Sequence, residues 1–353
     1  MPTTITEPST KVIGGVDTHK LFHVAVVINM IGHVLGTSRF DANPTGYQSL
    51  LDWLGSFGTV YKVGVEGTGA YGAGLARHLQ ADGVIVVEVN RPNRQTRRRK
   101  GKSDPTDAEA AARAVLSGEA SLIPKDTTAE TEAVRALRVV RRSAMRNRTQ
   151  AANQIHNLIL TAPATLRSDL DTKSILRVVP QILSIESGVI DGPEAATIFS
   201  LRSLAQRWQS LTVEIKHLDD ALKTLVTRVA PPRLLAMLGV GTDVAGALLV
   251  AAGSNPERLH NEAGFAALCG VSPVETSSGK RQGTHRLNQG GNREANNALW
   301  RITMVRMSHD PTTRDYVERR TKEGKSKKAI MRCLKRYIAR EIFNTLKPTN
   351  HLT

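Results

Sequence analysis

Four acidic residues, Asp17, Glu66, Asp104 and Asp107, occupy positions that suit a metal-dependent phosphoryl transfer. Asp17 and Glu66 each end a short apolar run, which predicts that a buried strand delivers the carboxylate to a sheet edge. Asp104 and Asp107 flank Pro105, a residue favoured at the start of a helix, and their i, i+3 spacing places them on one helical face. Two strand-end acids facing two helix-start acids predict a site for a pair of divalent cations, which stabilise the attacking and leaving oxygens of a phosphoryl transfer.

Helix capping is the alternative interpretation of Asp104 and Asp107, because aspartate near a helix N-terminus stabilises the helix by roughly 1 kcal/mol. The preceding segment favours a functional site. It carries cations and no acid, as expected of a loop that holds a nucleic-acid backbone beside bound metal ions. Its basic residues are Arg91, Arg94, Arg97, Arg98, Arg99, Lys100 and Lys102.

The elements that must position these acids follow a recognisable order. Three β-rich runs come first, separated by turn-like segments, and predict an antiparallel opening. Helices and strands then alternate, which is the order of an RNase H-like fold of the α/β class. The expected strands are 12–16, 22–28, 34–40, 60–66 and 84–89, and the expected helices are 46–54, 71–81 and 107–116.

Composition restricts the class of partner. The chain has 353 residues, enough for two or three domains, and a formal net charge of +16 that favours a polyanion. Aromatic residues at 4% argue against a stacking platform for single strands.

Cys269 and Cys333 form no metal-ligand or disulfide pattern. The N-terminus does not resemble a signal sequence, and the most apolar stretch, 244–252, is too short to span a bilayer. We therefore expect a soluble, cytoplasmic protein without a membrane partner.

From residue 130 to about 229 the pattern becomes long and helical. Apolar residues keep an approximate helical period from Val134 to Ile159 and again from Leu204 to Leu225, where the spacing approaches a heptad repeat. Two packed helices in a globular core, or an antiparallel arm or dimer surface, both fit this pattern. Pro231-Pro232 marks the next boundary, before a third, largely helical part. These boundaries predict three domains, 1–125, 126–229 and 230–353.

Two features of the third part suit contact with phosphate. Leu238-Gly239-Val240-Gly241 fits a turn between two short helices, either a helix–hairpin–helix element that offers backbone N–H groups or an ordinary connection. From Glu318 to Arg340, ten basic and two acidic residues give a net charge of +8. This run predicts a basic helix lying on nucleic acid.

Ser278 is a candidate nucleophile. Gly279, Lys280 and Arg281 follow it, and nearby cations stabilise both a serine alkoxide and a phosphodiester under attack. Ser-Gly is also a common loop dipeptide, so the physical chemistry alone leaves an ordinary loop as the alternative.

A different motif predicts different chemistry. Residues 67–72 fit the pattern G-x-G-x-x-G after a predicted strand, and Glu88 stands at about the distance of a ribose-binding acid. Against this dinucleotide-binding fingerprint stand the acid Glu66 just before the turn and the antiparallel opening upstream. The arginine-rich run after Val89 has no evident use in hydride transfer.

Three segments, in this order, resemble the acidic motifs of the DEDD transposases of insertion-sequence family one-ten. The turn at Leu238, residues 265–273 and Ser278-Gly279-Lys280 with the following glycine-rich stretch resemble that family's C-terminal transposase domain. The resemblance covers nearly the whole chain. The three acidic segments are Gly15-Val16-Asp17-Thr18-His19-Lys20, Val65-Glu66-Gly67-Thr68-Gly69 and Lys102-Ser103-Asp104-Pro105-Thr106-Asp107-Ala108.

The resemblance implies a RuvC-like domain, a helical coiled-coil arm and a small, mostly helical C-terminal domain with a catalytic serine and a basic tail. It implies Mg²⁺ or Mn²⁺ on the four acids and covalent attachment of DNA to Ser278, with Ser277 beside it as the alternative. It also implies double-stranded DNA (element ends and target), a structured bridge RNA as guide, a dimer that pairs into a tetramer, and association with the bacterial nucleoid. The expected nucleic-acid contacts are Arg94, Arg97, Arg98, Arg99, Lys100, Lys102, Lys280, Arg281, Arg286, Lys327 and Lys328.

The expected function is thus a transposase that cuts and rejoins DNA strands to excise and insert its own element. Three alternatives remain open. One is a junction-resolving nuclease in which metal-activated water attacks and the serine is idle. The others are a dinucleotide-binding oxidoreductase and a nucleic-acid-binding protein without catalysis.

Overall fold

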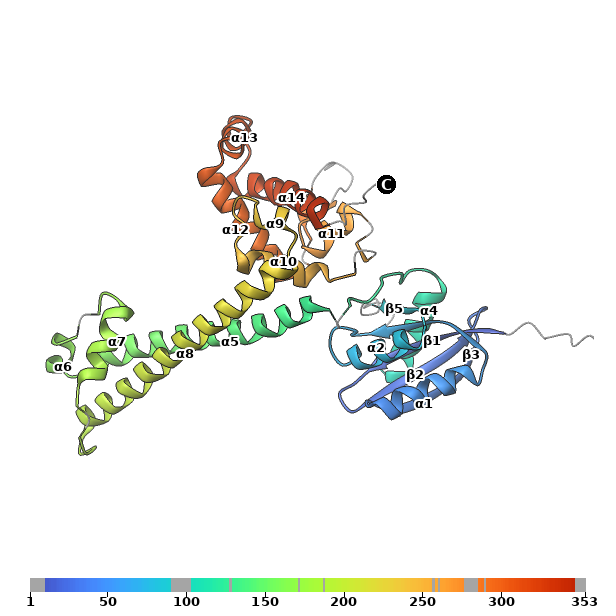
Figure 1. Ribbon diagram of the computed structural model, residues 1–353, viewed down its shortest axis with the longest axis horizontal. Helices are drawn as coiled ribbons and strands as arrows, with labels where there is room; N and C mark the ends of the chain where they lie inside the picture. The colour runs from blue at the N-terminus through green and yellow to red at the C-terminus, as the bar shows by residue number, and fades with distance from the viewer. Residues whose placement is uncertain are drawn as a thin grey trace, which may run out of the picture. The chain divides into compact units, whose positions relative to one another are not determined.

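A computed structural model describes residues 10–89, 103–126, 129–170, 172–186, 188–255, 258–259, 261–275, 285–288 and 290–346. The chain forms two compact units (Figure 1). The N-terminal unit comprises Met1–Ala129 and Gly253–His260, and the C-terminal unit comprises Glu130–Ala252 and Asn261–Thr353. A short segment from late in the chain therefore packs with the first unit, where the Asn255 side chain accepts from the backbone of Asp126 and donates to the carbonyl of Pro124.

The N-terminal unit is built on a five-stranded sheet of order β3-β2-β1-β4-β5. The first three strands pair antiparallel, as predicted, and β4 and β5 run parallel to β1. All five predicted strands are confirmed, with ends that differ by at most two residues. They are β1 (Lys11–Thr18), β2 (Phe22–Asn29), β3 (Val34–Asp41), β4 (Thr59–Glu66) and β5 (Val86–Val89).

Helices cover both faces of this sheet, as Figure 1 shows. Helices α1 (Pro44–Gly55) and α2 (Ala73–Ala81) share a core with Val12 and Val16 of β1. Helix α4 (Asp104–Leu116) packs with Ile13 on the other face. Successive residues of a strand point to opposite faces, so the odd-numbered residues of β1, including Asp17, share the α4 face.

Two glycines let α4 lie directly against the sheet. A Cβ atom on Gly15 would stand 2.2 Å from the carbonyl oxygen of Ala108, and one on Gly64 would stand 2.7 Å from a methyl group of Val115. Each glycine precedes a strand-end acid by two residues and lies on the same face as that acid, which brings the start of α4 close to both.

The C-terminal unit contains two long helices, α5 (Glu130–Thr161) and α8 (Pro193–Val229). They run antiparallel and pack side by side along their length (Figure 1). The short helices α6 (Ala164–Ser168) and α7 (Ile175–Ser184) connect them and add an apolar core at that end, where Trp208 packs. Both long helices were predicted from their apolar periodicity, although α8 begins at Pro193, well before the predicted stretch that starts at Leu204.

The remaining helices complete this unit. The rings of Phe265 and Phe343 lie 6.2 Å apart where α11 packs on α14. A small antiparallel pair, β6 and β7, was not predicted, because strands of three residues are too short to show alternation. The elements are α9 (Pro232–Leu235), α10 (Thr242–Ala252), α11 (Glu262–Leu268), β6 (Pro273–Glu275), β7 (His285–Leu287), α12 (Arg293–His309), α13 (Pro311–Lys322) and α14 (Lys327–Leu346).

The prediction of one basic helix over residues 318–340 is wrong. The run divides between α13 and α14, and Gly324 between them has φ +80°, a conformation that only glycine adopts readily. No helix among the described residues combines the length and the apolar character needed to cross a membrane.

Candidate active site

Asp17 and Glu66 lie side by side at one end of the sheet. Strands β1 and β4 pair in parallel with Val16 opposite Val65, so the next residue of each strand is an acid. The hydroxyl of Thr18 donates to the backbone carbonyl of Glu66 at 2.8 Å and ties the two strand ends together. Both acids follow a glycine that contacts α4, and strand alternation places both on the α4 face.

Asp104 and Asp107 lie on the first turn of α4. Neither is the capping residue, because Ser103 holds that position and its hydroxyl accepts from the backbone N–H of Thr106. The alternative that one of these aspartates is the N-cap is therefore excluded, although both lie in the first turn, where a negative charge interacts favourably with the helix dipole. The side chain of Asp104 is 39% exposed, whereas Asp107 is buried at 4% exposure.

His19 joins this cluster and was not singled out by its sequence. Its Nε2 atom lies 3.2 Å from a carboxylate oxygen of Asp17 and 3.4 Å from one of Asp104. The ring also contacts Phe22 at 4.8 Å, and the Arg39 guanidinium covers the other ring of that pair at 3.6 Å. The only signal in the sequence was a histidine two residues after a strand-end acid, which by itself is common.

The site concentrates negative charge. Burial raises the pKa of Asp17 above its ordinary value, and the neighbouring carboxylates of Asp107 and Asp104 raise it further, although His19 lowers it. Carboxylate oxygens of Asp17 and Asp104 and the imidazole nitrogen of His19 all lie within 4.8 Å of one another, a grouping that could hold a metal ion. Carboxylates are the ligands that Mg²⁺ and Mn²⁺ prefer, so the residues present fit such an ion.

A cavity of about 370 Å³ opens beside the two strand-end acids. Asp17 and Glu66 line it together with Tyr71 and Glu88. Glu88 is the acid that the dinucleotide-binding alternative needs for a ribose, but its carboxylate lies 3.6 Å from the guanidinium of Arg258. The antiparallel strands β1, β2 and β3 also depart from a dinucleotide-binding sheet, so the structure disfavours that alternative.

Most of the predicted nucleic-acid contacts lie outside the described residues. These are Arg94, Arg97, Arg98, Arg99, Lys100, Lys102, Lys280 and Arg281, and the same holds for Ser277 and Ser278. Among the described residues, Glu275 pairs with His285 in the β6–β7 ladder. The two residues that flank the serine-containing segment therefore lie next to each other. Arg286 belongs to β7, opposite Val274.

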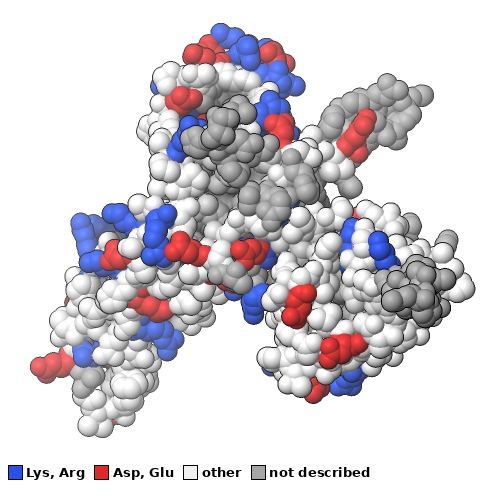
Figure 2. All heavy atoms as spheres, turned by 45° about the vertical axis from the view of Figure 1, so that its right-hand side comes forward, with Lys and Arg blue, Asp and Glu red and all other residues white. Residues whose placement is uncertain are grey.

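The second basic run is less available than its composition indicates. Lys327 and Lys328 are exposed on the first turn of α14. Arg336 and Arg340, however, both bind Glu262, and Lys335 donates to Asn296 at 2.6 Å. Figure 2 shows basic and acidic side chains side by side over α13, where Lys322 pairs with Glu318 and Arg320 with Glu323. Glu262, an acid outside the run, therefore offsets part of its net charge of +8.

In the Gly-x-Gly turn between α9 and α10, Gly239 packs against α12, whereas Gly241 has open space around it. Gly239 has φ +87°, and a Cβ atom there would meet Ile302 of α12 at 3.2 Å. The carbonyl of Leu238 accepts from Arg306 at 3.2 Å. Contact with α12 on this side favours an ordinary connection over a phosphate-binding turn.

Comparison with known proteins decides the family. A family model for the DEDD domain of IS110 transposases matches residues 14–162, which contain all four acids. A second model, described as transposase IS116/IS110/IS902 family, matches residues 232–318. The chain belongs to the IS110 family of transposases. This is the insertion-sequence family one-ten that the three acidic segments resemble.

Individual relatives of this IS110-family chain are distant. An uncharacterized 43.6 kDa protein of insertion element IS110 from Streptomyces coelicolor is 28% identical over 43% of this chain and 36% of its own length. A probable family 20 transposase from Pseudomonas aeruginosa is 29% identical over 51% of this chain and 52% of its own. A transposase for insertion sequence element IS1328 from Yersinia enterocolitica is 24% identical over 66% of this chain and 67% of its own. The chain thus spans between about a third and two thirds of the length of these relatives.

Proposed function

We propose that this protein is a transposase that cuts and rejoins DNA strands to move its own insertion sequence. The observation that carries the proposal is the convergence of Asp17, Asp104 and Asp107 from two separate elements, with Glu66 on the neighbouring strand. Membership of the IS110 family supports the same activity. The strand order β3-β2-β1-β4-β5, with only the first three strands antiparallel, supports an RNase H-like, RuvC-like assignment of the N-terminal unit.

Asp17, Glu66, Asp104 and Asp107 would hold the divalent cations, Mg²⁺ or Mn²⁺, of this site. Bound there, such ions stabilise negative charge on the attacking and leaving oxygens of the scissile phosphate. His19 positions the carboxylates of Asp17 and Asp104 through its contacts with both. The raised pKa of Asp17 means that a bound cation competes with a proton for this carboxylate.

The serine step is the part of the proposal that goes furthest beyond the described residues. The Ser278 hydroxyl gives up its proton and its oxygen attacks the scissile phosphorus, and the bond from phosphorus to the leaving DNA oxygen breaks. The product is a phosphoserine link and a free DNA hydroxyl, so the energy of the phosphodiester is kept for rejoining. Positive charge from Lys280 and Arg281 supports this role, because it stabilises both the alkoxide and the phosphate.

The partners follow from the same proposal. Double-stranded DNA at the element ends and at the target is the substrate, and a structured bridge RNA supplies the target sequence by base pairing. The long pair α5 and α8 supports a coiled-coil arm for assembly into a dimer and then a tetramer, because Phe199 and Val213 of α8 are exposed apolar side chains. In this proposal the chain divides into the domains 1–125, 126–229 and 230–353, in the cytoplasm beside the nucleoid.

A junction-resolving nuclease is the second candidate, because its water-based chemistry needs the acids alone. A denaturing gel of the protein with labelled element-end DNA and Mg²⁺ separates the two. The transposase leaves a covalent protein–DNA adduct, which is lost in Ser278→Ala and kept in Ser277→Ala. The opposite pattern moves the nucleophile to Ser277. Strand cleavage without any adduct in the wild type and in both variants supports the nuclease instead.

A further inference from the structure

The C-terminal unit contains a second charged cleft, of about 570 Å³, between α5, α10 and α12. Six arginines and two acids line it, a formal excess of four positive charges. We infer that this cleft binds the phosphodiester backbone of a nucleic acid, an inference that rests on the proposed function. The arginines are Arg138, Arg141, Arg142, Arg146, Arg293 and Arg301.

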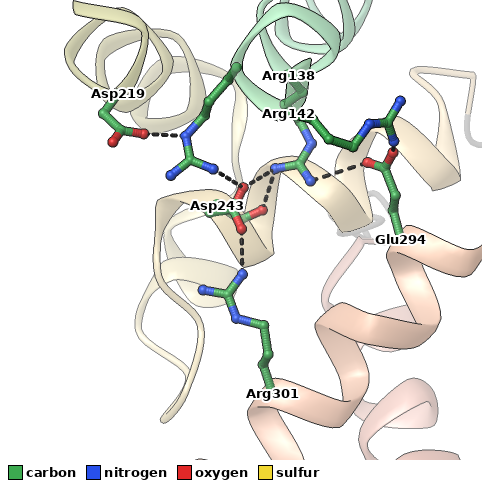
Figure 3. A network of polar contacts seen from close by, with 7 residues as sticks. Arg138, Arg142, Asp219, Asp243, Glu294 and Arg301 are labelled. Carbon is green, nitrogen blue, oxygen red and sulfur yellow. Dashed lines mark hydrogen bonds and ion pairs between the residues drawn. The ribbon is translucent and has the colours of Figure 1, made fainter. Parts of the chain in front are cut away.

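An inner layer of this cleft is held in place by acids. Figure 3 shows guanidinium groups converging on Asp243 of α10 from α5 and α12. Arg138 is 12% exposed and also reaches Glu294 at 3.2 Å, and Arg141 at 19% exposure binds Asp219 of α8. Burial would raise the pKa of Asp243, but the surrounding arginines outweigh it and lower the pKa below its ordinary value. Asp243 therefore remains a carboxylate that fixes the guanidinium groups around it.

The outer arginines of this cleft face solvent and outnumber the acids near them. Arg142 pairs with Glu294 and Arg301 pairs with Asp243, yet their side chains stay 45% and 46% exposed. Within the part of the chain that the structure describes, the exposed Arg146 and Arg293 make no ion pair. A network that served only to hold α5, α8, α10 and α12 together would need no more arginines than acids. Six arginines, however, face only three carboxylates when Asp219 is included. Crowded like charges are stabilised by a ligand of opposite sign.

The spacing of the arginines suits an extended polyanion better than a small anion. Arg138, Arg142, Met145 and Arg146 lie on one face of α5, since residues three and four apart in a helix are neighbours. From Arg138 to Arg146 this face extends about 12 Å at 1.5 Å per residue, several times the rise of roughly 3.4 Å between successive phosphates of one strand. Arginine also binds phosphate through two parallel hydrogen bonds, which lysine cannot do.

Binding measured against salt concentration tests the cleft. Fluorescence anisotropy of the full chain with a mixed-sequence DNA duplex, and separately with an RNA hairpin, gives the slope of log affinity against log salt. Removing one arginine that binds a phosphate lowers that slope by about 0.7–0.9, so Arg146→Ala/Arg293→Ala should lower it by about 1.4–1.8. The nucleic acid that shows this reduction, or both, identifies the ligand of the cleft.

Matched variants distinguish phosphate binding in the cleft from a general effect of the protein's positive charge. Arg167→Ala/Arg207→Ala removes two exposed arginines from α6 and α8, outside the cleft, and should leave the slope near its wild-type value. Arg146→Lys/Arg293→Lys should keep the slope while weakening binding. An unchanged slope in Arg146→Ala/Arg293→Ala, or an equal reduction in Arg167→Ala/Arg207→Ala, overturns the inference. Thermal melting confirms that each variant is folded.

The experiments distinguish a wrong assignment of the cleft from a wrong proposed function. If Arg146→Ala/Arg293→Ala binds both nucleic acids as the wild type does, and wild-type protein still cleaves DNA, only the cleft assignment is overturned. If the slope falls as expected but the wild type forms no cleaved product with Mg²⁺ or Mn²⁺, the cleft stands and the transposase proposal does not.

Discussion

The two units of this protein concentrate opposite charges by different structural means. In the N-terminal unit, carboxylates from a strand end and a helix start converge around Asp17, and the Nε2 atom of His19 lies 3.2 Å from its carboxylate. In the C-terminal unit, arginines from two helices converge around Asp243. The acidic cluster sits on the rigid face of a sheet, whereas the basic cluster spans three packed helices.

The pKa values of the two central aspartates, Asp17 and Asp243, shift in opposite directions. Burial and neighbouring acids raise the pKa of Asp17, while the arginines around Asp243 outweigh its burial and lower its pKa. Ionised Asp17 therefore opposes folding until a cation binds, and ionised Asp243 supports folding by itself. The acidic cluster around Asp17 therefore fits a reversibly bound metal ion. The ion pairs around Asp243 fit a structural role that leaves the outer arginines available to a polyanion.

Removing an acid of the first cluster should have the largest effect. We expect Asp17→Ala or Asp104→Ala to reduce cleavage of element-end DNA by more than about a hundredfold, beyond the 10–100-fold typical of removing an outer partner of a metal ligand. Asp52→Ala, which changes an exposed acid of α1, is the matched control and should cleave as the wild type does. Wild-type cleavage by Asp17→Ala, or by the unaltered protein in excess EDTA, would contradict the metal assignment.

Breaking the centre of the second cluster should affect stability. Asp243→Asn deprives the nearly buried Arg138 of one of its two acids, and we expect a decrease of about 1–3 kcal/mol in the free energy of unfolding, measured in urea at neutral pH. Asp219→Asn, at a carboxylate that is 47% exposed, should cause a smaller decrease.

The sign of the pH dependence sharpens the same test. Because the pKa of Asp243 is lowered in the folded protein, its contribution is present above the ordinary carboxyl pKa and is lost as pH falls through the folded-state value. The stability difference between wild type and Asp243→Asn should therefore shrink on acidification. A difference that stays constant down to strongly acidic pH would show that Asp243 acts through packing alone.

Basic residues outside the cleft should contribute moderately to binding. Lys327→Ala/Lys328→Ala removes two exposed cations from α14 and should lower the salt slope for a DNA duplex by about 0.9 for each phosphate that these lysines bind. Arg336→Ala/Arg340→Ala, which frees Glu262, should instead change mainly the melting temperature. Equal slopes in the wild type and the lysine variant would mean that Lys327 and Lys328 are only a solvated charged surface.

The smallest expected effect is the most specific to the acidic cluster. In EDTA at neutral pH, Asp17→Asn should melt at a slightly higher temperature than the wild type, because a raised folded-state pKa makes ionised Asp17 unfavourable above that value. Mg²⁺ should raise the melting temperature of the wild type more than that of Asp17→Asn. A lower melting temperature for Asp17→Asn in EDTA would mean that the cluster is already neutralised by its protein neighbours.

Local patterns determined much of the N-terminal unit. Strand alternation has a period of two residues, so the apolar runs before Asp17 and Glu66 predicted both the strands and the edge at which the acids stand. The apolar periodicity of α5 and α8 likewise predicted two long helices, since each helix shows its buried stripe in its own sequence. The family resemblance, carried by the same local segments, is confirmed.

Only the tertiary structure decided how distant residues meet. His19 became part of the acidic cluster because Gly15 allows α4 to approach β1 and places Asp104 beside it, a contact between segments more than 80 residues apart. The arginine cleft depends on α5 and α12 meeting at Asp243, and Arg138 and Glu294 are separated by 156 residues. In the basic run at 318–340 the sequence showed the positive charge but not the acid that pairs with two of its arginines, because Glu262 lies on another helix. Charge is a property of a residue, whereas compensation of that charge is a property of the fold.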